Sequence, residues 1–91
     1  MALTSGDFQA YDFNRMVVLF TMKNDQADVP CAVSTDAMDG LEGSSRTTPA
    51  QREQQFLRLR DRIEARAARK VSDVELEGNP PGVILRAIDF R

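Results

Sequence analysis

Histidine is absent from this chain of 91 residues, and cysteine occurs once. Without histidine the chain lacks the usual general base near neutral pH, the Ser-His and Cys-His nucleophile pairs, and every metal site that needs an imidazole. The single cysteine, Cys31, excludes an intrachain disulfide and a cysteine-rich zinc site. Many classes of small enzyme are therefore excluded, and the stability of the fold must come from packing.

Long apolar runs are also missing. The longest one, Met16 to Phe20, is far shorter than the roughly 20 residues that a helix needs to cross a bilayer. The first residues contain no basic and apolar leader, and a lone thiol suits a reducing compartment. We therefore expect a soluble, cytoplasmic protein with no membrane partner.

The composition that remains is that of a folded domain, with 42% apolar and 29% charged residues. A chain of this size buries only about 60 to 65% of its unfolded surface, which leaves one core and little room for a deep pocket. Twelve basic and 14 acidic residues give a net charge of −2, which argues weakly against bulk affinity for polyanions. We expect one compact domain over residues 1–91, with a flexible, polar segment at 1–7.

Two β-strands are indicated in the first half of the chain. Residues 16–22 are rich in β-branched and aromatic side chains and apolar on both alternate faces at their start, which favours an interior strand. Val29, Cys31 and Val33 alternate on one face, so the two segments predict an antiparallel hairpin. Pro30 cannot donate a ladder hydrogen bond, which favours an edge position or an unpaired side for its nitrogen.

Two helices are indicated between residues 34 and 70. Ser34 is typical of a helix cap and begins a short helix that ends near Gly40 or Gly43. Residues 48–51, Thr-Pro-Ala-Gln, form a capping box with proline at the first helical position, and the helix that follows should run from Pro49 to about Lys70. One apolar stripe of this helix should face the sheet: Phe56, Leu59, Ile63 and Ala67.

Residues 72–90 complete the predicted fold. Residues 74–77 alternate between apolar and acidic, a proline- and glycine-rich turn follows at 78–82, and residues 83–90 read as a last strand. The pattern predicts an α+β domain: an antiparallel sheet of three to four strands, from residues 16–34 and 72–90, packed against one long helix, with the short helix at its edge. The aromatic residues Tyr11, Phe13 and Phe90 are expected in the core; exposed together, they would favour a homodimer.

The order and spacing of four segments resemble a small bacterial family of uncharacterised proteins, the domain-of-unknown-function family DUF1488. These segments are Tyr11-Asp12, the run Val29 to Ser34 with Ala37 and Met38, the helix positions Arg60, Ile63 and Ala67, and the run Ile84 to Phe90. The resemblance covers most of the chain and implies a compact α+β domain without an established activity, catalytic residue or cofactor. The turn at 78–82 and the polar loop around Ser44 depart from the family pattern.

The long helix carries an uneven charge. Residues 49–70 hold seven basic and three acidic side chains, a net of +4, against −6 for the rest of the chain. Four arginines at helical spacing form what we name the arginine stripe: Arg58, Arg62, Arg66 and Arg69. A row of guanidinium groups can meet successive phosphates of a nucleic acid. We favour the alternative, in which these arginines pair with acids of the fold, such as Asp36, Asp39 and Glu42, or with a second subunit.

Other candidate chemistry has a simpler explanation. Cys31 could be a nucleophile or redox sensor, but its apolar strand face favours a buried structural thiol. Asp36 with Asp39, and Glu75 with Glu77, could chelate a hard cation or act as acid and base, yet the first pair suits a helix start and the second a solvent-facing strand.

No catalytic motif, metal ligand set or cofactor-binding motif is predicted. The leading hypothesis is a small noncatalytic interaction module of the cytoplasm. Such a module binds either a protein partner, which the sequence does not identify, or a second copy of itself as a homodimer. The alternative is a nonspecific nucleic-acid-associated protein that uses the arginine stripe, and an enzyme ranks third.

Overall fold

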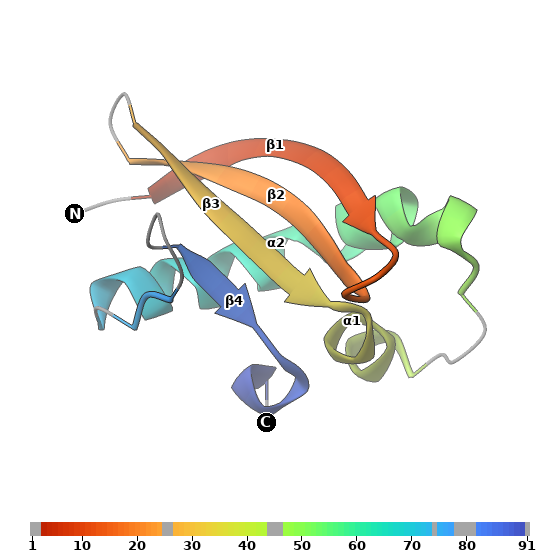
Figure 1. Ribbon diagram of the computed structural model, residues 1–91. Helices are drawn as coiled ribbons and strands as arrows, with labels where there is room; N and C mark the ends of the chain where they lie inside the picture. The colour runs from red at the N-terminus through yellow and green to blue at the C-terminus, as the bar shows by residue number, and fades with distance from the viewer. Residues whose placement is uncertain (1–2, 25–26, 44–46, 74, 78–81, 91) are drawn as a thin grey trace.

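A four-stranded sheet and one long helix form the two layers of the structure (Figure 1). The structure is a computed structural model that describes residues 3–24, 27–43, 47–73, 75–77 and 82–90. Strands follow one another across the sheet in the order β1-β2-β3-β4, and helix α2 (Arg52–Ser72) covers one face. The predicted α+β class and the pairing of a sheet with a long helix are confirmed.

The predicted hairpin is present as β2 (Val17–Asn24) and β3 (Ala27–Ser34), which pair antiparallel with Phe20 opposite Cys31. Pro30 lies in the interior strand β3, opposite Thr21. Strand β4 pairs with β3 only at residues 31–33, so Pro30 lies outside that ladder. An interior strand therefore tolerates this proline because its neighbour is short.

The three aromatic residues between positions 8 and 13 indicate a short extended piece or a turn, but the structure has a strand of ten residues there, β1 (Leu3–Asp12). Its pairing with β2 shifts register between Ser5 and Phe8 and again between Phe8 and Ala10. These irregularities break the alternation by which a strand is recognised, since Phe8 and Tyr11, three residues apart, both pack against the core. Residues 3–7 of the segment expected to be flexible thus belong to a paired strand; their mobility stays a prediction.

The last strand is shorter than predicted. Strand β4 (Val83–Leu85) runs parallel to β3, so the sheet is mixed rather than wholly antiparallel. The chain then turns into a 3-10 helix, η2 (Ala87–Phe90), where the sequence predicted strand. Asp89 explains the turn, because its carboxylate accepts a hydrogen bond from the Arg86 amide and its own amide donates to the Arg86 carbonyl.

The turn predicted at 78–82 is described only at its ends. Glu77 and Gly82 exchange two backbone hydrogen bonds of 2.8 Å, the arrangement of an antiparallel bridge. Residues 78–81 lie outside the described part of the chain, as does Ser44 in the polar loop.

Both predicted helix starts are confirmed. Helix α1 (Thr35–Glu42) begins at Ser34, whose hydroxyl accepts from the Ala37 amide, and ends at Gly43, which adopts a left-handed φ of 66°. A 3-10 turn, η1 (Pro49–Gln51), precedes α2, and the Gln51 side chain accepts from the Thr48 amide as the capping box requires. Helix α1 lies at the end of the sheet where β3 finishes, beside η2 (Figure 1).

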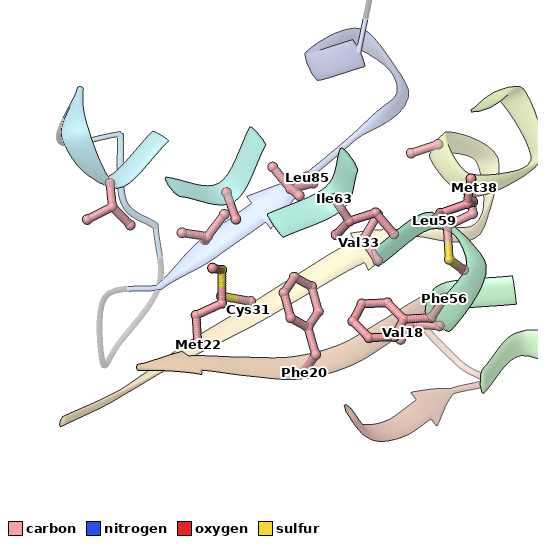
Figure 2. Close-up of a cluster of buried hydrophobic side chains, with 14 residues drawn as sticks. Val18, Phe20, Met22, Cys31, Val33, Met38, Phe56, Leu59, Ile63 and Leu85 are labelled. Atoms are coloured by element: carbon pink, nitrogen blue, oxygen red, sulfur yellow. The ribbon is translucent and has the colours of Figure 1, made fainter. Parts of the chain in front are cut away.

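The core lies between the sheet and α2 (Figure 2). The predicted stripe is buried in full: Phe56, Leu59, Ile63 and Ala67. The Phe56 ring sits 4.9 Å from that of Phe20, between centroids, and 5.9 Å from that of Phe8.

Two of the three aromatic residues expected in the core contribute to it. Tyr11 and Phe90 are half-buried and pack against the core cluster. Phe13 is 65% exposed in the turn after β1, where its ring centroid lies 5.4 Å from that of Tyr11. The expectation of a core role is therefore wrong for Phe13.

Candidate functional site

The face of the sheet that points away from α2 is the first candidate surface. In the part of the chain that the structure describes, no helix lies over this face (Figure 1). We name it the open face, and its residues alternate with the core residues of the same strands: Val17, Leu19, Thr21, Pro30, Ala32, Ser34 and Ile84. Most of these side chains are apolar, although a sheet face without a covering layer is usually polar. Val17, Thr21 and Ala32 are nevertheless buried, so the solvent-accessible part of the face comes from Leu19, Pro30, Ser34 and Ile84.

Two neighbouring hollows lie on the open face. One has a volume of about 530 Å³ and is lined by Val17, Ser34 and Ile84 with residues of η2. The other, of about 180 Å³, is lined by Leu19, Ala32 and Ile84. Ile84 and Arg15 line both, so the two hollows lie side by side and mark one depressed region across β2, β3 and β4.

The rim of this depression carries charges of both signs. Glu77 and Arg86 pair with each other through two hydrogen bonds of 2.9 and 3.1 Å. Arg15 and Asp36 also line the hollows and are exposed, but neither side chain forms an ion pair with any described residue. Within the described ranges, the rim of the open face therefore carries a cation and an anion, Arg15 and Asp36, that have no ion-pair partner.

The arginine stripe is the second candidate surface, and its four members differ in the ion pairs that they form. Arg58 donates two hydrogen bonds to Glu42, at 2.9 and 3.1 Å, which lowers the pKa of that carboxyl. Arg66 lies 3.5 Å from the Asp89 carboxylate, and Arg69 lies 4.0 Å from Asp73. Arg62 has no ion pair within the described ranges. The expected neutralisation within the fold is thus observed for Arg58 and is partial elsewhere.

A buried polar network joins the two helices behind the stripe. Arg52 donates to Asp39 at 2.8 Å and to Gln55 at 2.6 Å, and Gln55 donates to Asp39 at 3.0 Å. Burial alone would raise the pKa of Asp39, but these hydrogen bonds outweigh it and hold the pKa below its usual value. Asp39 is therefore a structural partner of α2, whereas its predicted companion Asp36 is exposed.

A second network fixes the chain after β4. Lys70, which is almost fully buried, donates to the Ile84 carbonyl at 2.9 Å and lies 3.1 Å from the Asp89 carboxylate. Burial would raise the pKa of Asp89, but the Arg86 amide and Lys70 lower it further than burial raises it. The sequence offered no signal for this network, because its members come from three separate elements.

The remaining residues that the sequence suggested as candidates form no catalytic or metal-binding group in the described part of the chain. Cys31 is buried as predicted, and burial raises the pKa of its thiol to about 12. Glu75 and Glu77 are exposed, and Glu77 is held by Arg86. Among the described residues, no group of three side chains could hold a metal ion. None of the described helices has the length and hydropathy that crossing a membrane requires.

Comparison with known proteins gives one family and one fold. Residues 5–80 match the model of a family described as "Protein of unknown function (DUF1488)". A crystal structure of a protein of unknown function from the DUF1488 family of Shewanella loihica PV-4 superposes with a TM-score of 0.75 at 17% sequence identity. The match covers 94% of this chain and 97% of that one, and at this identity it shows a common fold. No curated protein matches the chain.

Proposed function

This chain belongs to the DUF1488 family, whose function is unknown, and we propose from its geometry that it is a small noncatalytic interaction module of the cytoplasm that pairs with a second copy of itself through the open face. The observation that carries the proposal is the apolar open face itself. Leu19 and Ile84 lie on it half-buried and under no described helix, whereas Val17 and Ala32 beside them are already buried. Burial of such a surface against a partner is favourable, because it removes apolar area from water.

A second copy fits the rim better than an unrelated partner of one charge sign would. In a two-fold symmetric interface the same patch meets itself and every contact occurs twice, so a cation of one copy can pair with an anion of the other, and the reverse. Arg15 and Asp36 supply one charge of each sign beside the same hollow. The open face is therefore complementary to itself in charge as well as in hydrophobicity.

The dimensions of the molecule permit a homodimer interface on its broad side. The protein measures 36 × 25 × 22 Å along its principal axes. A stable interface needs about 800 Å² from each partner, which the broad side of such a molecule can supply. The alternative site of self-association, the long edge strand β1, is poorly suited, since its two register shifts disrupt the flat edge that strand pairing between copies requires.

Sedimentation analysis over a range of protein concentrations tests the proposal. We expect a reversible dimer, and Leu19→Lys should abolish it while the circular dichroism spectrum stays folded. Arg15→Glu and Asp36→Arg should each weaken association by about tenfold, as the loss of one interfacial charge pair does. The doubly reversed variant, with both substitutions, should associate again because the cross-subunit pairs are restored.

Asp61→Arg is the matched control, since Asp61 is an exposed acid on α2, outside the open face. Its association should equal that of the unaltered chain. A strictly monomeric protein at submillimolar concentration, or association unaffected by Leu19→Lys, would overturn the proposal.

The second candidate function is nonspecific nucleic-acid binding through the arginine stripe. The pairing of Arg58 with Glu42 takes up one of its four cations at the start of the row, so the other three are confined to the second half of α2. The pairing pattern therefore supports the interaction module over a polyanion surface. A gel-shift titration at low salt checks this, and binding that survives replacement of all four stripe arginines by glutamate would eliminate the stripe as its cause.

A further inference from the structure

The second half of α2 and the turn η2 enclose a shallow hollow of about 430 Å³. We name it the arginine hollow, and its lining residues are Arg62, Ala65, Arg66, Arg69, Asp89 and Phe90. It lies between α2 and η2 and shares no lining residue with either of the hollows of the open face. Three arginines from successive turns of one helix thus converge on one volume of small-molecule size.

Asp89 holds the Arg66 side chain at this site. Its Nε donates to the Asp89 carbonyl at 2.6 Å, and its Nη2 lies 3.5 Å from the Asp89 carboxylate. The same carboxylate also pairs with Lys70, so one negative charge serves two cations. Nη1 of Arg66 is buried and has no hydrogen-bond partner in the part of the chain that is described. The guanidinium is therefore positioned but not neutralised.

Arg62 and Arg69 are not neutralised by strong ion pairs with the described residues. Arg62 forms no ion pair with any residue in the described ranges. The ion pair of Arg69 with Asp73 spans 4.0 Å between side chains that are 76% and 51% exposed, a geometry that contributes little free energy. The three arginines of the hollow and the neighbouring Lys70 outnumber the two carboxylates that pair with members of this group, Asp73 and Asp89, which leaves a net positive charge at the hollow.

We propose that the arginine hollow binds the phosphate group of a small phosphorylated molecule. Guanidinium groups match phosphate oxygens through paired, charge-assisted hydrogen bonds, and several arginines at one point favour a compact dianion. Ala65 keeps the floor free of a long side chain, and the half-buried Phe90 ring supplies an apolar wall for the organic part of the ligand. This site is independent of the proposed dimer.

A nucleic acid fits the same residues less well. Arg62 and Arg69 are seven residues apart, or roughly 10 Å along the helix axis. The stripe does not continue toward the start of α2 as free charge, because Glu42 occupies Arg58 with two hydrogen bonds. The free cations thus form one cluster and not a track along which successive phosphates could lie.

Amide NMR titration of the full chain is the test, with inorganic phosphate, phenyl phosphate and a single-stranded oligonucleotide as separate probes. We expect saturable shifts for residues 62–69 and 87–90, with phenyl phosphate tighter than inorganic phosphate because of Phe90. Arg62→Gln and Arg69→Gln should each weaken phenyl phosphate binding by about tenfold, the effect of one lost charged contact.

Arg58→Gln is the matched control, since it removes the same charge from the same helix outside the hollow, and it should change the affinity less than about twofold. Three results would overturn the proposal. They are shifts that never saturate, a loss of affinity in Arg58→Gln equal to that in Arg62→Gln, and an oligonucleotide that binds more tightly than phenyl phosphate with shifts along the whole of α2.

Discussion

The Asp39 carboxylate of α1 lies 2.8 Å from an Nη1 nitrogen of Arg52, at the start of α2, in a position where the arginine side chain is only 7% exposed. Gln55 closes the contact by bonding to both. The two helices are thereby joined at a fixed point, although the loop between them contains residues outside the described part of the chain. Breaking such a pair leaves a buried charge without its partner.

Asp39→Ala should therefore destabilise the protein, by about 2 to 3 kcal/mol, because Arg52 stays buried without an acceptor of opposite charge. Urea unfolding monitored by circular dichroism measures the change. Asp61→Ala, which removes an exposed acid from α2, serves as the control and should stay within about 0.5 kcal/mol. Equal losses in the two variants would contradict a structural role for Asp39.

Acid should weaken the fold in a defined range of pH. Asp39, Glu42 and Asp89 each have a folded-state pKa below the ordinary value, which is 3.8 for aspartate and 4.5 for glutamate. Their contribution to the free energy of unfolding is complete above those ordinary values and is lost as the pH falls through the lower folded values. We expect nearly constant stability down to about pH 5 and a steady decline below it, measured by urea midpoints at successive pH values. Stability that increased from pH 5 to pH 3 would disprove this account.

Two glycines should respond in opposite directions to alanine. A Cβ atom on Gly82 would lie 2.3 Å from the Pro30 carbonyl oxygen, so Gly82→Ala must displace β3 or the start of β4 at a cost of about 1 to 3 kcal/mol. A Cβ on Gly40 meets nothing within 4 Å inside α1, so Gly40→Ala should stabilise by about 0.5 to 1 kcal/mol. Thermal unfolding of both variants checks the contrast, and a stabilised Gly82→Ala would show that the two strands are not so close.

Neighbouring residues on α2 should differ sharply in the cost of truncation. Phe56→Ala removes a ring that is fully buried against Phe20 and Phe8, and we expect a loss of about 3 to 5 kcal/mol. Leu57→Ala removes a side chain that is nearly half exposed, and we expect about 0.5 kcal/mol or less. Comparable losses would mean that α2 is rotated about its axis relative to the sheet.

Cys31 should be inert in the folded protein. The thiolate is the reactive form, and burial raises the pKa of this thiol to about 12, so little thiolate exists at about pH 8. Iodoacetamide labelling followed by mass spectrometry should be slow in buffer and rapid in denaturing urea. Labelling at the same rate in both would show that the thiol is accessible in the native state.

The parts of the fold that local patterns determine could be predicted from the sequence. The Ser34 cap, the capping box at 48–51 and the helical stripe from Phe56 to Ala67 depend on residues within a few positions of one another, and all three are confirmed. Strand β1 and the end of β4 could not be predicted in the same way. Register shifts hide the alternation of β1, and Asp89 ends the last strand with the help of Lys70, which lies on another element.

The candidate surfaces were predictable in part. The arginine stripe follows from helical spacing, but the division into a paired Arg58 and an unpaired Arg62 depends on where Glu42 and Asp89 fold. The open face had only one signal, the apolar residues on both sides of residues 16–20. That pattern indicates an interior strand. It does not show that the second face of this strand lacks a covering helix among the described residues.

The parallel pairing of β4 with β3 has a consequence for synthesis of the protein on the ribosome. Val83 and Leu85 complete the core beside Cys31 and Val33, yet they are translated after both helices. A nascent chain that ends before residue 83 therefore exposes the β3 edge and part of the apolar stripe of α2. We expect such intermediates to depend on chaperones or to aggregate, because unpaired strand edges and exposed apolar surface promote association.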